Sequence, residues 1–204
     1  MTSPAARGRR PAAETRAEIL GVALALFTEK GYEATSVRDI SEALGVTKSA
    51  LYYHFRNKEE IVASLVAERR EEVRELAAWI SAQPRTPGLV REAALRWIAG
   101  TTPERLAVMR LAQANQPVMR RLSEDAADIP GAFEEVVALL VDEPADEQQR
   151  LAVRMAFDTV RAALLAAQGT TATDRNVVEA ARRATVALTR PEALPGPEGD
   201  TADR

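Results

Sequence analysis

The stretch Val37–Phe55 reads V-R-D-I-S-E-A-L-G-V-T-K-S-A-L-Y-Y-H-F and decides the fold of this 204-residue chain. Val37, Ile40 and Leu44 recur at the three- and four-residue spacing of one helix face. Gly45 follows where the chain must turn sharply into a second short helix, because glycine adopts backbone angles that other residues avoid. Two short helices joined at such a turn are typical of a helix-turn-helix that reads DNA.

The second helix of this pair, from about Thr47 to Tyr53, divides its side chains by position. Thr47 is expected to cap its start, and Val46 to fill the angle between the two helices. The spacing places Ala50, Leu51 and Phe55 toward the core. A helix that exposes a lysine, hydroxyls and tyrosines together suits contact with a DNA groove and with phosphates. The residues expected to face outward are Thr47, Lys48, Ser49, Tyr52 and Tyr53.

The residues before this stretch predict a supporting helix and a second contact point. From Ala12 to Lys30 apolar residues recur with helical spacing, and a glycine follows them. Thr35 and Ser36 precede the first helix of the pair, and Ser36-x-x-Asp39 predicts a helix cap with its acid in the first turn. Hydroxyls and free N–H groups at a helix start also bind phosphate, so this end can rest on a DNA backbone.

Composition excludes several classes of active site. The apolar share of 46% is enough for a sizeable core, in one long domain or two small ones. The absence of cysteine excludes disulfides, thiolate metal sites and cysteine nucleophiles, and a single histidine leaves the usual zinc and Ser-His-Asp sites without their parts. We therefore expect no enzyme, no metal and no cofactor. A carboxylate-based enzyme stays open on composition alone, because Asp and Glu are plentiful.

Charge is unevenly distributed along the chain. Residues 1–58 hold nine Lys and Arg against six Asp and Glu, whereas the rest hold 18 against 24. Residues 1–11 include three arginines without a following apolar run, so they do not read as a secretory signal. They are either a solvated tail or a basic arm that touches DNA. No apolar run reaches the roughly 18 residues of a membrane helix, which predicts a cytoplasmic protein.

Two runs of sequence carry a resemblance to a known family. Thr35–Ile61 reads T-S-V-R-D-I-S-E-A-L-G-V-T-K-S-A-L-Y-Y-H-F-R-N-K-E-E-I, and Ile19–Tyr32 reads I-L-G-V-A-L-A-L-F-T-E-K-G-Y. Together they closely resemble the N-terminal DNA-binding domain of the TetR family of bacterial transcriptional regulators, over roughly residues 14–65. A bare glycine turn would be weak evidence, whereas this combination of motifs is specific.

The resemblance implies roles for individual residues. The family often has glycine or a small polar residue where Ala50 stands, a mild departure that bears on sequence preference. By resemblance the reading positions that face the groove are Thr47, Lys48, Ser49 and Tyr52, and the positions that contact the DNA backbone are Thr35, Ser36, Tyr53, His54 and Lys58. For the tyrosine pair and His54 a purely structural role, as half-buried packing or as a capping residue, stays open.

The remaining sequence predicts an all-α protein of about nine to ten helices. Asn57-Lys58-Glu59-Glu60 reads as a capping box that opens a long helix, and this helix leads into a C-terminal helical bundle. Thr102 with Pro103, and Asp146 with Gln149, read as further helix starts. We expect a flexible arm at 1–11, a DNA-binding domain at 12–57, a ligand-binding and dimerisation domain at 58–190 and a disordered tail at 191–204. The later helices are expected at about 88–99, 103–113, 116–126, 130–141, 146–168 and 173–189.

The last two predicted helices carry alanine-rich apolar faces. These faces either pack within their own domain or form a two-fold, four-helix dimer interface, which the resemblance favours. The residues concerned are Leu151, Met155, Val160, Ala163, Leu164, Ala167, Val177, Val178, Ala181, Val186 and Leu188.

Residues of the middle helices are candidates for a pocket that binds an aliphatic or amphipathic small molecule. They are Trp97, Met109, Gln113, Met119, Phe133, Phe157 and Arg161, although tryptophan and methionine at helical spacing are more often plain core. The function predicted by the resemblance is a homodimeric regulator, and a repressor in particular, that binds a palindromic operator and is released by a small-molecule effector. The alternative is a helical module that binds small molecules or proteins without specific DNA binding.

Overall fold

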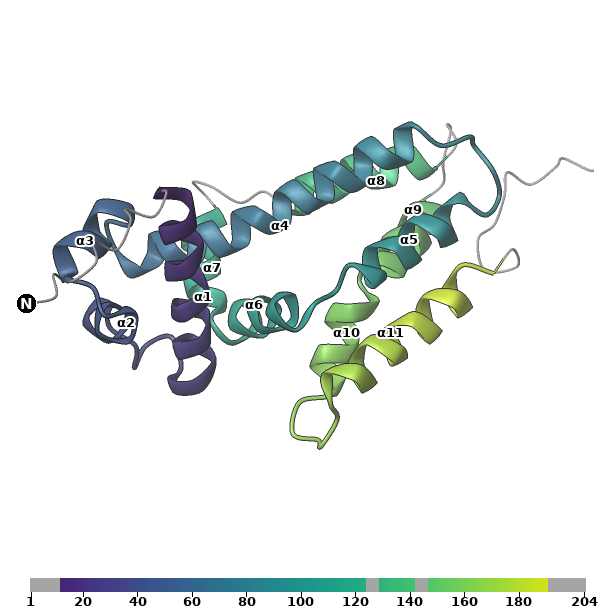
Figure 1. Ribbon diagram of the computed structural model, residues 1–204. Coiled ribbons are helices and arrows are strands. Elements are labelled where there is room, and N and C mark those ends of the chain that lie inside the picture. Colours follow the sequence, from purple (N-terminus) through teal and green to yellow (C-terminus); the bar gives the residue numbers. More distant parts are fainter. Residues whose placement is uncertain (1–11, 124–128, 142–146, 191–204) are drawn as a thin grey trace, which may run out of the picture.

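The computed structural model describes residues 12–123, 129–141 and 147–190. The predicted basic arm, the predicted tail and the cap assigned to Asp146 lie outside these ranges. Within them the chain forms helices and no strands, which confirms the all-α prediction (Figure 1). The helices are α1 (Ala12–Lys30), α2 (Val37–Leu44), α3 (Lys48–His54), α4 (Lys58–Ser81), α5 (Leu89–Ala99), α6 (Pro103–Ala114), α7 (Gln116–Ser123), α8 (Ile129–Leu140), α9 (Glu147–Phe157), α10 (Thr159–Ala166) and α11 (Asp174–Leu188).

The first three helices gather at one end of the molecule and share an apolar core with the start of α4 (Figure 1). Ile40 and Leu51 are fully buried in this core, and Phe55 is 1% exposed. Leu111 of α6 and Val118 of α7 belong to the same cluster, so the C-terminal half of the chain packs directly against α1. We call this group of side chains the first cluster.

Helix α4 connects the two ends of the molecule, with α8 packed along its second half (Figure 1). Asn57 caps it by accepting a hydrogen bond from the Glu60 N–H at 2.8 Å. The Glu60 carboxylate returns to the N–H of Arg56 at 2.7 Å, one residue before the N-cap position that a capping box uses. Val73, Leu76 and other α4 residues join α5, α8 and α9 in a second cluster around Trp97 and Phe157.

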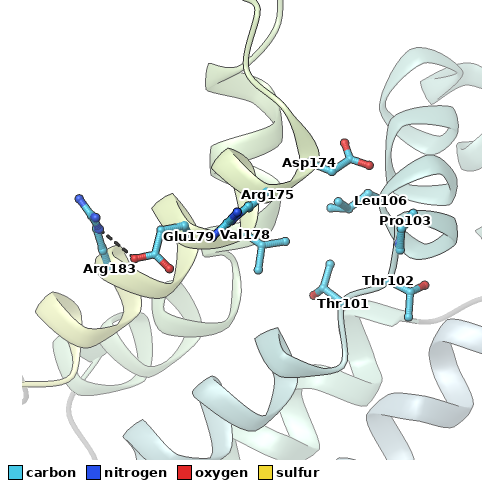
Figure 2. Close-up of a pocket in the computed structure, with 9 residues that line it drawn as sticks. All are labelled: Thr101, Thr102, Pro103, Leu106, Asp174, Arg175, Val178, Glu179 and Arg183. Atoms are coloured by element: carbon cyan, nitrogen blue, oxygen red, sulfur yellow. Dashed lines mark hydrogen bonds and ion pairs between the residues drawn. The ribbon is translucent and has the colours of Figure 1, made fainter.

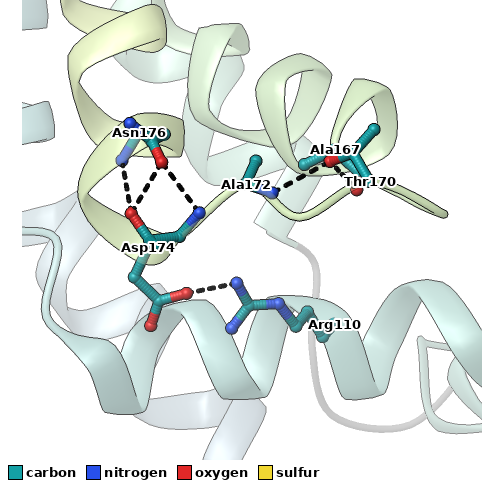
Figure 3. Close-up of polar contacts among 7 residues, drawn as sticks. Arg110, Ala167, Thr170, Ala172, Asp174 and Asn176 are labelled. Carbon is teal, nitrogen blue, oxygen red and sulfur yellow. Dashed lines mark hydrogen bonds and ion pairs between the residues drawn. The ribbon is translucent and has the colours of Figure 1, made fainter.

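The third cluster lies between α6, α10 and α11, with α10 and α11 side by side. Its buried members are Ile98, Leu106, Val160, Leu164, Val177 and Ala181. Arg110 of α6 forms an ion pair with Asp174 at the start of α11, as Figure 3 shows. Arg91 of α5 bonds to the carbonyl of Thr189 at 2.9 Å. These contacts fasten both ends of α11.

The single helix predicted at 146–168 is wrong, because the chain divides at Asp158 into α9 and α10. The buried hydroxyl of Thr185 on α11 donates to the carbonyl of Ala156 at 3.0 Å and lies 2.9 Å from the hydroxyl of Thr159. A carbonyl bonded to another helix is drawn away from the regular helical ladder, which favours a bend there. This division raises the number of helices in the described residues to eleven, against the nine to ten expected.

No helix within 12–123, 129–141 and 147–190 has both the length and the apolar character needed to cross a membrane.

Candidate functional site

The start of α2 is fixed by a reciprocal set of hydrogen bonds. Ser36 accepts from the Asp39 N–H at 3.2 Å, and the Asp39 carboxylate accepts from the Ser36 N–H at 2.7 Å. Hydrogen bonds from the Ser36 hydroxyl and N–H hold the pKa of Asp39 below its ordinary value. This is the capping box predicted from Ser36-x-x-Asp39, and it presents a helix start at the surface.

The turn between α2 and α3 depends on glycine. Gly45 has φ +66°, in the left-handed region, and its N–H bonds to the Glu42 carbonyl at 3.1 Å. The N–H of Val46 closes the turn on the Ser41 carbonyl at 3.0 Å. Val46 itself is 38% exposed, so it fills the interhelical angle less than predicted. The fully buried Ile40 of α2 and Leu51 of α3 do most of that packing.

Helix α3 presents an exposed polar face on a narrow apolar base. Leu51 and the following Phe55 form its buried side, whereas Tyr52 and Tyr53 are 50% and 83% exposed. Ala50 is exposed rather than buried, because in so short a helix the core covers only the stripe through residues four apart. The outward prediction for Thr47, Lys48, Ser49, Tyr52 and Tyr53 is confirmed by their exposure.

His54 is half-buried at the end of α3, with its ring 5.2 Å from that of Tyr53 in an edge-to-face arrangement. This contact steadies both rings beside the beginning of α4. Ser36 at the start of α2 is also exposed. The predicted residues that are exposed therefore come from the start of α2 and from α3 with its N-cap, all at the same end of the molecule.

Thr35 and Lys58 make internal contacts instead. Thr35 is 1% exposed, and its hydroxyl donates to the Gly31 carbonyl at 2.8 Å. The Lys58 ammonium donates to the carbonyls of Tyr32 at 2.6 Å and of Thr35 at 3.0 Å, and lies 4.0 Å from the centre of the Tyr32 ring. Both side chains hold the turn between α1 and α2 to the start of α4. Burial raises the pKa of the Tyr32 phenol above its ordinary value.

The seven predicted ligand-binding residues do not gather at one site. Trp97, Phe133 and Phe157 lie together in the second cluster, with ring centres 5.1 Å apart for the first pair and 6.1 Å for the second. Met119 packs on the first cluster and Met109 on the third. Gln113 donates to the backbone carbonyl of Arg161 at 3.3 Å, and the Arg161 side chain pairs with Asp158 at the surface.

A charged group that the sequence analysis missed lies beside the aromatic residues. Arg69 and Glu72 of α4 form an ion pair at 3.0 Å, and Glu72 also pairs with Arg105 of α6 at 2.5 Å. The Arg69 guanidinium lies over the Trp97 ring, 3.7 Å from its centre. A second bond ties Arg105 to the carbonyl of Gly100. The sequence does show that Arg69 and Glu72 are three residues apart on one helix. Such a pair usually forms an exposed salt bridge, so the spacing alone did not point to the interior.

The groove shown in Figure 2 lies between the start of α6 and α11 and has a volume of about 650 Å³. It is lined by Thr101, Thr102, Pro103, Leu106, Asp174, Arg175, Val178, Glu179 and Arg183, which include none of the seven predicted ligand residues. Arg183 pairs with Glu179 at 3.0 Å on its rim, so opposite charges face each other there. The lining therefore has no dominant sign of charge.

Comparisons of sequence with known proteins match only part of the chain. Residues 19–65 match the family described as bacterial regulatory proteins, tetR family. The HTH-type transcriptional regulator AcrR of Shigella flexneri is 33% identical over 104 residues, 49% of this chain and 47% of AcrR. The HTH-type transcriptional repressor KstR2 of Rhodococcus jostii is 41% identical over 66 residues, 32% of each chain. The chain thus spans less than half the length of these curated relatives.

Solved structures extend the likeness in fold to nearly the whole chain. The ketosteroid transcriptional regulator KstR2 of Mycobacterium tuberculosis superposes with a TM-score of 0.61 over 89% of this chain and 95% of its own, at 20% identity. At that identity the superposition shows the fold alone. The sequence match, by contrast, falls on the helices that form the first cluster and the exposed face of α3. Residues 19–65, which form this N-terminal domain, therefore match the tetR family of bacterial regulatory proteins in sequence.

Proposed function

We propose that this protein is a transcriptional repressor that binds a palindromic operator as a homodimer and is released by a small-molecule effector. The observation that carries the proposal is the exposed face of α3, where Lys48, Ser49, Tyr52 and Tyr53 stand on the buried Leu51. A short helix that offers amine, hydroxyl and phenol groups on a rigid base suits the major groove. A regulator of this kind acts in the cytoplasm, where the bacterial chromosome lies.

Within this proposal the exposed residues have separate roles. Thr47, Lys48, Ser49 and Tyr52 select bases, while Ser36, Tyr53 and His54 contact phosphates and hold the register. Lys58 reaches the same end of the molecule, where its ammonium spans two carbonyl groups. Its main contribution is to keep the α1–α2 turn in place, and a phosphate can use its remaining N–H donor. Thr35 supports that turn through its buried hydroxyl.

Dimerisation through the last helices is supported by the apolar residues that this chain does not bury. Val160, Leu164, Val177 and Ala181 fill the third cluster, so they are used within one copy. Leu151 and Met155 of α9 are 57% and 54% exposed, and Leu165 of α10 is 61% exposed. Three alanines are exposed as well, namely Ala162 of α10 and Ala180 and Ala184 of α11. A second copy would cover these side chains.

Two copies are needed because one reading helix covers too few base pairs for useful specificity. Related by a two-fold axis, two such helices about 34–36 Å apart would read successive major grooves. Helix α4 begins in the DNA-binding domain and continues through the second cluster, so it can transmit a change at the effector site to the reading helices. A coupling of about 1–3 kcal/mol is typical of such control.

A gel-shift titration with the DNA upstream of the protein's own coding sequence tests the proposal, at about 0.15 M salt, where non-specific binding is weak. We expect retardation that survives excess unrelated DNA. The alternative function, a helical small-molecule or protein-binding module, predicts no sequence-selective retardation. The exposed leucine and methionine residues of α9 and α10 give that alternative its only specific support. Footprinting should show two half-sites related by symmetry.

A further inference from the structure

The group formed by Arg69, Glu72 and Arg105 lies where the three apolar clusters meet. Arg69 and Glu72 follow the part of α4 that joins the first cluster and precede Val73 of the second. Arg105 of α6 is next to Leu106, a buried member of the third cluster. Charged side chains therefore lie between residues of the three apolar clusters.

The charges in this group do not balance. Two guanidinium groups share the single Glu72 carboxylate, which leaves one positive charge uncompensated within the group. The Arg69 side chain is only 14% exposed, and burial lowers its pKa to about 10. A cation that is removed from water in this way gains from any further anion that reaches it.

Hydrogen-bonding capacity is also left over. Among the residues that the structure describes, one of the five N–H donors of Arg69 has an acceptor, the Oε2 of Glu72 at 3.0 Å. The Glu72 and Arg105 side chains are each 24% exposed, so the group reaches the surface of the molecule at these two residues. The Arg69 guanidinium lies over the Trp97 ring, 3.7 Å from its centre, and a guanidinium group can bind a planar, two-oxygen acceptor along its edge.

Three aromatic rings adjoin the cations, and two of them are buried, since Trp97 is 5% and Phe157 4% exposed. The ring of Trp97 beneath Arg69 meets that of Phe133 at 5.1 Å, and Phe133 meets Phe157 at 6.1 Å. We propose that Arg69 and Arg105 bind the carboxylate of a small amphipathic monoacid whose apolar part packs against Phe133, the partly exposed ring of the three. One uncompensated positive charge matches a singly charged carboxylate better than a doubly charged phosphate ester.

Binding of this kind gives a physical basis for release from DNA, and in that respect it rests on the proposed function. The incoming carboxylate competes with Glu72 for the donors of Arg69 and Arg105. Glu72 is the bridge that fastens α4 to α6, so its loss loosens the helix that continues into the DNA-binding domain. The ligand therefore favours a different position of α4, which is the differential contact that a switch requires.

Trp97 offers a direct optical test, because the chain contains only one other tryptophan, Trp79. In the full-length Trp79→Phe protein, phenylacetate, benzoate and octanoate are titrated against the fluorescence of Trp97, each beside its neutral amide. We expect saturable changes with at least one acid, and binding of its amide weaker by about tenfold or more, as for loss of a charge-assisted hydrogen bond. Phenyl phosphate should bind more weakly than the best acid.

Two substitutions on α4 locate the site. Arg69→Met should weaken acid binding by about tenfold or more, and Arg69→Lys should weaken it as well because lysine lacks the planar fork. Arg74→Met is the matched control, since Arg74 lies on the same helix, 53% exposed, and pairs with the surface residue Glu71. Glu72→Gln should strengthen acid binding by removing the competing carboxylate.

The wild-type comparison of acid with amide decides the proposal even if an Arg69 variant does not fold. Equal binding of acid and amide, no saturable response to any of the three acids, or equal loss in the Arg69 and Arg74 variants would overturn it. Operator binding is measured on the same preparations. Retardation of DNA without acid binding would reject this site and leave the repressor proposal standing, whereas acid binding without retardation would reject the repressor proposal alone.

Discussion

The two halves of this chain bury charge in opposite ways. In the N-terminal half, which we propose binds DNA and call the DNA-binding half, the first cluster is closed and apolar around Ile40, Leu51 and Phe55, and most polar groups are on the surface. In the other half, charged Arg69, Glu72 and Arg105 lie between the clusters.

Under the proposed function, in which the N-terminal half reads DNA and the other half is the sensing half that responds to an effector, this contrast fits the two tasks. A reading helix must keep one shape, which a closed apolar core provides. A sensing core must have two arrangements of similar free energy, and a charged group with one unmatched cation is able to supply them. The two halves should therefore respond differently to substitution, and four experiments test that difference.

The largest effect is expected for Phe55→Ala. Phe55 is 1% exposed and lies under the Arg16 guanidinium, 4.6 Å from its ring centre, so truncation should cost about 3–5 kcal/mol of stability. Hydrogen exchange in α1–α3 should rise, while Trp79 and Trp97 fluorescence, which reports the other half, should change less. Tyr53→Ala, at an 83% exposed position, is the control and should stay within about 0.5 kcal/mol. Simultaneous unfolding of both halves would show that they form one cooperative unit.

Glu72→Gln should have the next largest effect, this time in the sensing half. It leaves Arg69 and Arg105 without their shared carboxylate, and loss of one partner of a partly buried charged group costs about 1–3 kcal/mol. Glu71→Gln removes the partner of an exposed pair one residue away and should cost about 0.5 kcal/mol or less. Urea unfolding followed by tryptophan fluorescence compares the two. Equal losses would mean that the central group is no more than a surface salt bridge.

The sequence predicted more of the DNA-binding half than of the other. Its caps at Ser36, Thr47 and Asn57 and its buried Leu51 follow from spacing within a few residues, so local rules sufficed. The prediction that Ala50 faces the core was wrong, because the core covers only a narrow stripe of α3. The sequence also did not show that Lys58 binds the protein's own backbone, because its two carbonyl partners lie in a turn 23 to 26 residues earlier.

In the sensing half the missing information is long-range. The division of the predicted helix at Asp158 depends on Thr185 of another helix. Arg105 meets Glu72 across 33 residues of sequence. Periodicity locates helices but does not say which helices meet, so the aromatic residues Trp97, Phe133 and Phe157 were identified without the cations beside them.

A third experiment compares base selection with backbone contact inside the DNA-binding half. Lys48→Ala should change which bases are preferred, at about 1–3 kcal/mol for the affected position, because Lys48 is exposed on α3. Tyr53→Phe should weaken binding to all sequences by a similar, smaller factor, since a phosphate contact carries no sequence information. Selection from a randomised operator library, followed by titrations at several salt concentrations, separates the two outcomes. An unchanged selection profile for Lys48→Ala would remove its reading role.

The smallest effect is expected from pH at the start of α2. The pKa of Asp39 is lowered by hydrogen bonds from the Ser36 hydroxyl and N–H, so the carboxylate stabilises the folded state when it is ionised. That contribution is present above the ordinary Asp pKa of about 3.9 and is lost as pH falls through the lower pKa of the folded protein. Asp39 is partly exposed at the surface, so the loss should appear as local fraying of α2 while the first cluster stays intact. NMR titration of the Asp39 carboxyl carbon measures this directly, and Ser36→Ala should return its pKa toward the ordinary value.

If the wild-type carboxyl titrates at or above the value found in Ser36→Ala, the cap does not depend on charge, and the DNA-binding half holds its helix starts by neutral hydrogen bonds alone.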